Sequence, residues 1–450
     1  MTFSSPLLRF APSPTGYLHI GNARVALLNA LLAQKLGGEF MLRIDDTDTE
    51  RSKEEYSAAI RQDLQWLGIT WQREEQQSLR FDRYQAALEQ LKASGRVYPC
   101  YDTPEELDLM RKTALGAGRP PIYDRSALRL TAAERAAYEA EGRQPHWRFK
   151  LEDSAIDWCD MARGDVHFDA KNLSDPVLYR ADGRPLYTIT SVVDDSDFSV
   201  SHILRGEDHV SNTATQIQLF EALGFAVPEF AHLPLLVGAD GKPLSKRWSS
   251  DSLQTMCADY EPEALGAFLL ALGTSLAAEP VDDLAQLIAG FDIATYGKAS
   301  PRFDVDALNA LNARQLQHGD GVRFVTRLID DGIPKEKAAE FWALVSANLG
   351  CFAEAQDWWR IVNEAPDDLD RDGEDIAFCQ VAAALMDDTV ATKEGYQDWM
   401  KRLKSTTGRK GKSLFMPIRH GLTGRSGGPE LDKIIALMGV KAAQKRLGRN

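Results

Sequence analysis

The chain has 450 residues, of which 44% are hydrophobic, and a formal net charge of −14 at pH 7. This length predicts two to four domains with substantial cores, and no stretch approaches the roughly 18 apolar residues of a membrane span. The first residues lack the basic and then apolar pattern of a secretory leader, and the five cysteines are scattered without a Cys-x-x-Cys pair. These features favour a reduced protein of the cytoplasm.

The first 100 residues alternate between strand and helix patterns. A short apolar strand at residues 7–10 leads through a turn rich in Pro and Gly to a helical pattern over residues 23–32. A strand over residues 39–44 and helices over residues 53–67 and 81–94 follow. This alternation predicts an α/β nucleotide-binding domain. The helix N-terminus that follows the first strand would suit a phosphate group, because free N–H groups and the helix dipole point there.

The pattern changes between residues 100 and 185, which we interpret as an α+β insertion. Polar helices are predicted over residues 104–117 and 131–142. Short strands are predicted over residues 146–151, 165–168 and 176–180 and, after a hairpin turn at 181–184, over residues 185–190.

The α/β pattern returns after the insertion and then gives way to helices. A strand over residues 203–207 and a helix over residues 212–223 are predicted. From residue 250 to the end the chain is predicted to be almost wholly helical, starting from a cap cluster of Ser249, Ser250 and Asp251. Pro262 suits the first turn of one of these helices.

The charge of the chain is unevenly distributed. Residues 401–450 contain 13 Lys and Arg against 2 Asp and Glu, whereas the first 400 residues contain 39 against 64. A basic end on an acidic body indicates contact with a polyanion at that end, and a solvated basic tail is the alternative. Apolar stretches at residues 414–418 and 434–438 predict that this block is folded.

Two segments carry a family resemblance. Residues 9–22 read Arg-Phe-Ala-Pro-Ser-Pro-Thr-Gly-Tyr-Leu-His-Ile-Gly-Asn and join the first strand to the first helix. This segment resembles the first motif of class I aminoacyl-tRNA synthetases, in the form of the glutamyl and glutaminyl branch. Residues 240–247, Asp-Gly-Lys-Pro-Leu-Ser-Lys-Arg, resemble the mobile KMSKS-type loop of that family, and Lys246 lies 227 residues after His19. Further matches near the C-terminus extend the resemblance over essentially the whole chain, in the manner of bacterial glutamyl enzymes.

The resemblance implies a Rossmann-type parallel-sheet catalytic domain with an α+β insertion, followed by an all-helical anticodon-binding region. The implied catalytic domain comprises residues 1–100 and 186–235, and residues 100–185 form an insertion that grips the acceptor end. Residues 236–305 form a stem-contact region with the KMSKS-type loop, and residues 306–450 form the anticodon-binding domain.

The resemblance also implies catalytic and ATP-binding residues. His19 would donate a hydrogen bond to the ATP phosphates, and Lys246 with Arg247 would close over the charge that builds on those phosphates in the transition state. A helix-capping role is the alternative for His19. Pro243 stands where the family has its first lysine, and Asn22 where the first motif ends in His. The implied ATP-binding residues are Pro12, Ser13, Thr15, Gly16, His19, Gly21, Asn22, Asp208, Leu244, Ser245 and Lys246.

For the amino acid, the resemblance implies a pocket with two arginines. Arg9 and Arg205 would hold the substrate carboxylates, because the guanidinium fork matches a carboxylate in a two-pronged pair. Asp45 would take the α-ammonium, although Glu is common there, and Ser191 stands where Asn is usual. The implied glutamate-binding residues are Arg9, Ala11, Ser13, Asp45, Tyr187, Ser191 and Arg205.

The implied function is ATP-dependent attachment of L-glutamate to tRNA(Glu) through a glutamyl-adenylate, with ATP and Mg²⁺ required and a monomer as the default state. One alternative is a glutamyl-type enzyme that charges tRNA(Gln), instead of or besides tRNA(Glu). Another is a catalytically degenerate RNA-binding paralogue, which the departures at Pro243, Asp45 and Ser191 favour. No zinc is expected in the insertion, because Cys100 is the one thiol at the positions where relatives bind zinc, and Asp102 replaces the second.

Overall fold

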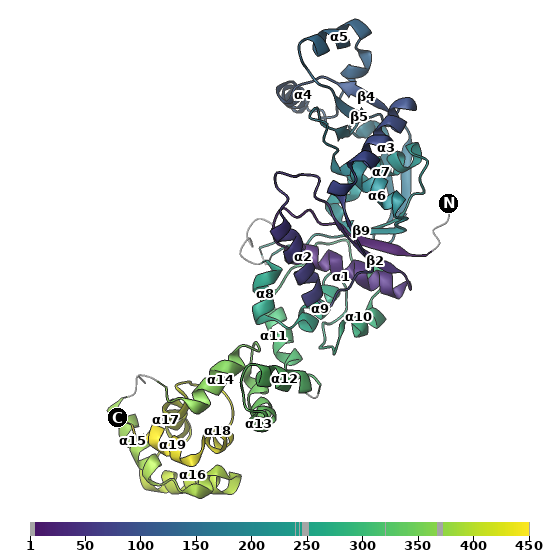
Figure 1. The fold of residues 1–450 in the computed structure, drawn as a ribbon. Helices are drawn as coiled ribbons and strands as arrows, with labels where there is room; N and C mark the ends of the chain where they lie inside the picture. Colours follow the sequence, from purple (N-terminus) through teal and green to yellow (C-terminus); the bar gives the residue numbers. More distant parts are fainter. Residues whose placement is uncertain are drawn as a thin grey trace. The chain divides into compact units, whose positions relative to one another are not determined.

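The fold is shown in Figure 1 as a computed structural model. It describes residues 5–238, 240–242, 244, 252–319, 321–366 and 372–449. The chain divides into two compact units. The first comprises residues 1–257, 266–278 and 283–304, and the second comprises residues 258–265, 279–282 and 305–450.

A mostly parallel sheet forms the core of the first unit. Its strands lie in the order β3-β2-β1-β9-β10-β6-β7, and every neighbouring pair is parallel except β6 with β7. The chain passes from β1 to β2 on one side and returns as β9 on the other, so the carboxyl end of β1 is a switch point of the kind where α/β sheets bind ligands. The strands are Leu7–Phe10 (β1), Glu39–Ile44 (β2), Arg73–Gln76 (β3), Ala155–Asp160 (β6), Gly164–Asp169 (β7), His202–Gly206 (β9) and Glu229–Leu233 (β10).

Helices cover both faces of this sheet (Figure 1). On one face, α1 contacts β1, β2 and β9. On the other, α3, α6 and α7 share a buried core with Leu7 and Met41, built around Tyr84 and Phe220. The helices of this unit are Ile20–Lys35 (α1), Glu54–Trp66 (α2), Phe81–Ala93 (α3), Tyr187–Asp197 (α6), Val210–Ala222 (α7), Leu253–Asp259 (α8), Pro262–Ala271 (α9, which continues from the second unit) and Leu284–Gly290 (α10).

The segment between residues 100 and 185 is divided between two sheets. A smaller antiparallel sheet joins Val97–Cys100 (β4), His146–Phe149 (β5) and Val177–Tyr179 (β8). Beside it lie Pro104–Gly116 (α4) and Ala132–Ala140 (α5), which bury no residue and both begin with a Thr–Glu capping box. Strands β6 and β7 instead extend the main sheet through the pairing of β6 with β10.

The strand predicted over residues 185–190 is wrong. Tyr179 forms one isolated bridge with Pro185, as the predicted turn requires, but helix α6 then begins at Tyr187. The Thr, Ile and Val residues of this stretch favour strands locally. Tertiary packing outweighs that preference, because Ile189, Val192 and Val193 lie at helical spacing and are fully buried among α3 and α7.

The second unit is helical, as predicted, and its described residues include two apolar cores. One is built around Phe324, Phe341 and Trp358, and the other around Trp399 and Ile418. Besides the start of α9, its helices are Val305–Gln315 (α11), Val322–Asp330 (α12), Lys335–Val345 (α13), Glu354–Asn363 (α14), Gly373–Ala384 (α15), Lys393–Thr407 (α16), Lys412–Thr423 (α17), Leu431–Met438 (α18) and Val440–Leu447 (α19).

The structure also bears on the predicted helix starts after residue 250 and on the expected absence of a membrane span. Pro262 is the first residue of α9, as predicted, whereas the cap cluster of Ser249, Ser250 and Asp251 lies outside the described residues. Over the ranges that the structure describes, no helix has the length and hydropathy needed to cross a bilayer.

Candidate active site

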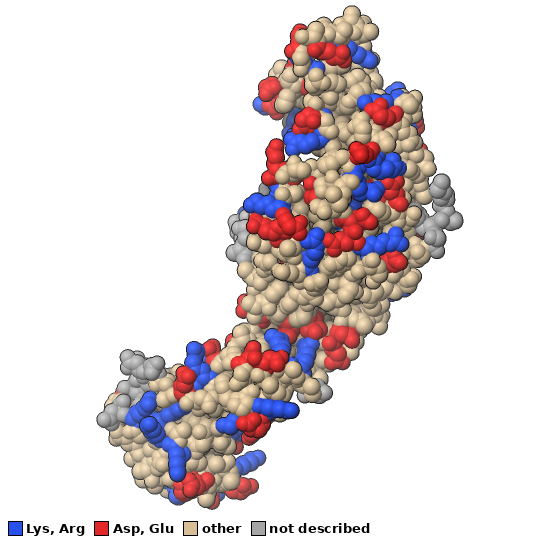
Figure 2. Space-filling model, viewed as in Figure 1, with Lys and Arg blue, Asp and Glu red and all other residues tan. Residues whose placement is uncertain are grey.

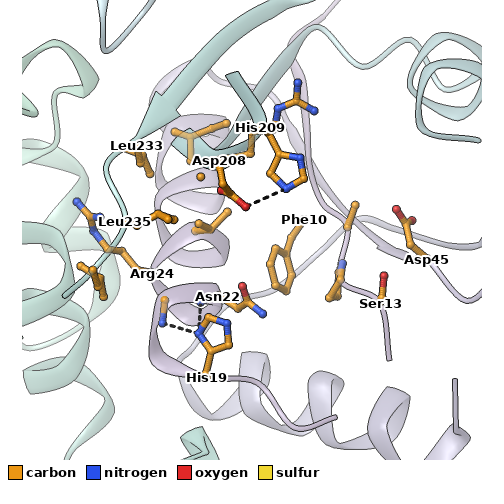
Figure 3. Close-up of a pocket in the computed structure, with 18 of the residues that line it drawn as sticks. Phe10, Ser13, His19, Asn22, Arg24, Asp45, Asp208, His209, Leu233 and Leu235 are labelled. Atoms are coloured by element: carbon orange, nitrogen blue, oxygen red, sulfur yellow. Dashed lines mark hydrogen bonds and ion pairs between the residues drawn. The ribbon is translucent and has the colours of Figure 1, made fainter. Parts of the chain in front are cut away.

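A cavity of about 540 Å³ opens at the carboxyl ends of β1, β9 and β10 (Figure 3). Its volume is in the range of small-molecule sites. Figure 3 shows His19 and Asn22 at the start of α1 on one side, with Asp208 and His209 across from them. The predicted site residues that line it are Arg9, Ala11, Pro12, Ser13, Thr15, His19, Gly21, Asn22, Asp45, Tyr187, Arg205, Asp208 and Leu244.

Among the predicted site residues that the structure describes, two do not line the cavity. Gly16 lies in the turn before α1 but is not part of the wall. Ser191 is fully buried in α6, and the Nη2 of Arg43 lies 3.4 Å from its Oγ. The position predicted to contact glutamate directly therefore contacts a buried arginine that pairs with Asp45 of the wall.

The predicted catalytic residues Lys246 and Arg247 lie outside the described residues, as do Pro243 and Ser245. The described residues on either side of this segment both reach the site. Leu244 lines the cavity, and Ser252 forms an isolated β-bridge with His19.

His19 is the N-cap of α1, and this cap fixes its tautomer. Its Nδ1 accepts hydrogen bonds from the backbone N–H groups of Gly21 and Asn22 at 3.1 and 3.4 Å. The neutral ring must therefore carry its proton on Nε2, which leaves an N–H donor on the ring edge away from the cap. Partial desolvation lowers the pKa of His19 and favours this neutral form. Gly21 leaves room for this cap, because a Cβ there would lie 3.0 Å from the imidazole ring and would press against it.

Arg205, at the end of β9, is a buried cation whose contacts are neutral groups. Its side chain donates to the Tyr187 hydroxyl at 2.9 Å, Thr213 Oγ1 at 2.6 Å and Gln216 Oε1 at 2.7 Å. Among the described residues it has no carboxylate within ion-pair distance, although it is only 6% exposed. Burial lowers the pKa of Arg205. A guanidinium held in this way on a cavity wall is available to an anionic ligand.

Arg9 and Asp45 belong to a buried network of charges. Arg9 donates to both oxygens of Asp195, with the Nε–Oδ1 distance 3.0 Å. Arg43 lies between Asp45 and Asp195, with an N–O distance of 2.7 Å to each, and Asp194 is 3.8 Å away. Burial opposes the charge on Arg43, but these carboxylates raise its pKa well above the usual value. The charge of Arg9 is thus partly balanced within the protein, unlike that of Arg205.

Asp45 occupies the cavity wall at the end of β2. Burial raises the pKa of Asp45 to about 6, against the opposing effect of Arg43. Burial and the nearby Arg205 lower the pKa of His209 to about 4. Of the two histidines of the wall, His209 is therefore neutral over the pH range in which Asp45 gains its charge, and desolvation shifts His19 toward its neutral form as well.

The predicted site residues included neither Arg24 and His209, which line the cavity, nor Arg43, which is buried beside Asp45. Arg43 follows three apolar residues in a buried strand, and that pattern could have marked it. Arg24 lines the cavity from α1 and donates to the carbonyl oxygens of Pro234 at 3.0 Å and Leu272 at 2.8 Å. It thereby ties α1 to the segment after β10. His209 faces the Tyr187 ring at 5.4 Å.

In the insertion, the Cys100 thiol faces a phenol. Its Sγ lies 3.4 Å from the Tyr123 hydroxyl, which donates to Asp102 at 2.7 Å. Burial raises the pKa of the Cys100 thiol to about 11, which disfavours the thiolate that a metal needs. No group of three His, Cys, Asp or Glu within the described part of the chain is placed to hold a metal ion.

We therefore expect the purified protein to contain no stoichiometric zinc, and chelators to leave its melting temperature unchanged. Structural zinc needs four ligands and contributes directly to folding, so its removal would lower the melting temperature. Elemental analysis and a thermal melt with and without a chelator measure both quantities. One zinc ion per chain would contradict this prediction.

Comparison with known proteins identifies the class to which this site belongs. Residues 7–310 match the family described as tRNA synthetases class I (E and Q), catalytic domain, and residues 335–450 match the anticodon binding domain. The chain belongs to the class I tRNA synthetases of the E and Q type, and within them to the glutamate–tRNA ligases, as its full-length relatives show.

Those relatives cover nearly the whole chain. Glutamate–tRNA ligase 2 of Methylorubrum populi is 51% identical over 447 residues, which are 99% of this chain and 98% of that protein. Glutamate–tRNA ligase of Azospirillum brasilense is 50% identical over 440 residues, 97% and 98% of the two chains. A crystal structure of a glutamate–tRNA ligase from Elizabethkingia meningosepticum, in complex with its amino acid, superimposes with a TM-score of 0.84 at 26% identity and covers 99% of this chain and 98% of that chain.

Proposed function

We propose that this chain attaches L-glutamate to tRNA(Glu) in two steps. Glutamate and MgATP first give an enzyme-bound glutamyl-adenylate, and the terminal adenosine of the tRNA then accepts the glutamyl group. The observation that carries the proposal is Arg205, a buried cation on the cavity wall that has only neutral partners in the described protein. Full-length relatives at about 50% identity, all named glutamate–tRNA ligases, support it.

The cavity supports glutamate binding at three points. Arg205 would pair with the side-chain carboxylate, and Arg9 would lie near the α-carboxylate while Asp195 holds its other face. Asp45 would take the α-ammonium from the end of β2. A neutral glutamine amide would leave the Arg205 charge unpaired in a buried place, which penalises the wrong amino acid.

The adenylate step needs charge stabilisation at the ATP phosphates. An oxygen of the glutamate α-carboxylate attacks the α-phosphorus, and pyrophosphate leaves with the bonding electrons. The His19 cap directs Nε2–H as a donor, while the N-terminal end of α1 contributes its dipole. We assign Lys246 and Arg247 to the pyrophosphate side, because the described ends of their segment, Leu244 and Ser252, both contact the site.

The pH dependence of glutamate binding should follow Asp45. At saturating MgATP we expect the KM for glutamate to rise as pH falls below about 6, because protonation of Asp45 removes the charge that faces the α-ammonium. His209 stays neutral over most of that range, since its pKa is lowered to about 4. Pyrophosphate exchange measured between about pH 5 and 8 gives this profile. The Asp45→Asn variant should have a raised KM that no longer depends on pH; the same dependence in this variant would contradict the assignment.

We assign tRNA binding to regions outside the cavity. Residues 100–185 would contact the acceptor end, residues 236–305 the stem, and residues 306–450 the anticodon. Figure 2 shows Lys and Arg side chains gathered on part of the visible face of the second unit. Not every basic residue is free for RNA: Arg446 is buried and donates to the carbonyl oxygens of Ile361, Val362 and Leu422.

Five exposed lysines of the second unit offer a test of RNA binding. Within the described residues none of them forms an ion pair; they are Lys404, Lys410, Lys412, Lys441 and Lys445. Their replacement by glutamine should weaken tRNA binding and lower the slope of log K against log salt by about 0.7–0.9 for each phosphate that the protein no longer neutralises. Lys401→Gln, whose lysine already pairs with Asp398, is the matched control. An unchanged slope would place these lysines away from the RNA.

The proposed function is tested by ATP–pyrophosphate exchange with glutamate, with and without tRNA. Glutamate-dependent exchange supports the enzyme and excludes the degenerate RNA-binding paralogue. RNA binding without exchange under either condition would favour that paralogue. Parallel charging reactions with tRNA(Glu) and tRNA(Gln) determine which tRNA is the substrate.

A further inference from the structure

We infer that Asp160 and His232 are positioning residues that set the glutamate specificity of Arg205 through one imidazole tautomer. The inference rests on the proposed function and adds residues that do not line the cavity. Asp160 ends strand β6 of the insertion, and His232 lies in β10, the neighbouring strand of the main sheet. The three side chains form a continuous buried chain of contacts that ends on the pocket arginine.

The first link joins Asp160 to His232. Asp160 Oδ2 lies 2.5 Å from His232 Nδ1, and both side chains are fully buried. The other oxygen, Oδ1, accepts backbone N–H groups of Ala162, Arg163 and His232 at 3.0–3.1 Å. Burial opposes the charge of Asp160, but these hydrogen bonds lower its pKa. Both oxygens of an ionised Asp160 are therefore occupied by donors.

The second link joins His232 to Arg205. His232 Nε2 lies 3.3 Å from Arg205 Nε and 2.8 Å from Thr213 Oγ1. A guanidinium Nε–H can only donate, so Nε2 must be the unprotonated nitrogen and the ring proton must lie on Nδ1, toward Asp160. Burial and the nearby Arg205 lower the pKa of His232, although Asp160 opposes this effect. The net lowering of the pKa favours the neutral ring.

This arrangement orients a cation without neutralising it. A carboxylate in direct contact with Arg205 would fix its position and also cancel the charge that recognises the substrate. With one imidazole between them, Asp160 fixes the acceptor for Arg205 Nε, and the charge of Arg205 stays available to the cavity. Thr213 and Gln216, both neutral, occupy Nη2, so the Nη1 group beside Tyr187 is the part left for the substrate.

The substitution Asp160→Asn tests the tautomer with almost no change of shape. The three backbone donors hold the oxygen of the amide at the Oδ1 position, so its NH₂ group must face His232 Nδ1. The ring proton then moves to Nε2, where it opposes the N–H of Arg205. We expect the KM for glutamate to rise by about 10- to 100-fold and the preference for glutamate over glutamine to fall. The KM for ATP should be unchanged.

The same hairpin supplies a matched control. Asp157, also in β6, lies 2.7 Å from His167 Nδ1 in β7, and both side chains are exposed. Asp157→Asn makes the same chemical change in an aspartate–histidine pair that has no hydrogen bond or ion pair to an arginine among the described residues, and should leave both KM values unchanged. A general loss of fold in Asp160→Asn would instead raise both KM values together and lower the melting temperature.

A second measurement needs no variant of Asp160. Nitrogen NMR of the ¹⁵N-histidine-labelled wild-type protein, with the His232 signals assigned by their loss in His232→Gln, reports which ring nitrogen carries the proton. We expect Nδ1–H; an Nε2–H or doubly protonated ring would overturn the inference. A wild-type protein without glutamate-dependent exchange would refute the proposed function. An active wild type with an unchanged glutamate KM in Asp160→Asn would refute this inference alone.

Discussion

Replacement of Arg205 by alanine is expected to lower kcat/KM for glutamate activation by roughly 30-fold or more. This corresponds to a loss of about 2–5 kcal/mol of transition-state stabilisation. The reason is that the side-chain carboxylate of the substrate would enter a buried site with no cation to receive it, while Tyr187, Thr213 and Gln216 would lose their common donor. The loss should appear mainly in the KM for glutamate. Pyrophosphate exchange at varied glutamate and varied ATP separates the two constants.

The same variant should discriminate less between glutamate and glutamine. Arg73→Ala is a suitable control, because Arg73 pairs with Glu39 at an exposed edge of the same sheet, away from the cavity lining. Exposed pairs of this kind contribute little, so its kinetics should match those of the wild type. If Arg205→Ala keeps the wild-type preference for glutamate, the recognition of the side-chain carboxylate lies elsewhere.

The second large effect is expected at Lys246. Its replacement by alanine should raise the activation free energy of adenylate formation by about 2–4 kcal/mol, which is the scale for one hydrogen-bond donor to charge in the transition state. The KM for glutamate and the folding of the protein should change little. The rate of pyrophosphate exchange at saturating substrates measures this directly. His19→Ala should also slow the step, because the Nε2–H donor is lost together with the cap of α1.

Lys242 offers the comparison for this experiment. It is exposed and directly precedes Pro243, which occupies the position of the family's first lysine. A smaller loss in Lys242→Ala than in Lys246→Ala would agree with our assignment. Wild-type exchange in Lys246→Ala would show that the charge on the leaving phosphates is stabilised by another group.

Local patterns predicted β1, β2, β9 and α1, four of the elements that border the site. The apolar runs at β1 and β2 were sufficient to predict these strands, because a parallel strand that is buried on both sides needs apolar residues on both faces. The glycines after α1 were sufficient to predict the end of that helix, where Gly37 adopts a φ of 65°. Strands β3 and β4 were missed, and so were β6 and β10. Their pairing joins residues distant in the sequence, at Asp160 and Phe230, and neither strand alone is apolar enough to mark it.

In the site, too, contacts between residues distant in the sequence could not be predicted. The family motifs led to His19, Arg9, Asp45 and Arg205, which line one cavity. For His19 the two interpretations of the sequence describe one arrangement, since the capping of α1 by Nδ1 is what directs Nε2–H outward. The contact of Asp160 with His232 spans 72 residues, and nothing local to either residue points to the other.

The most direct test of the account is a competition between amino acids. The protein is incubated with MgATP, tRNA(Glu) and equal concentrations of glutamate and glutamine, and the amino acid attached to the tRNA is identified by mass spectrometry. We predict glutamate, because a carboxylate pairs with Arg205 and an amide leaves its charge buried and unpaired. Comparable amounts of glutaminyl-tRNA, or RNA that binds and remains uncharged, would contradict the account.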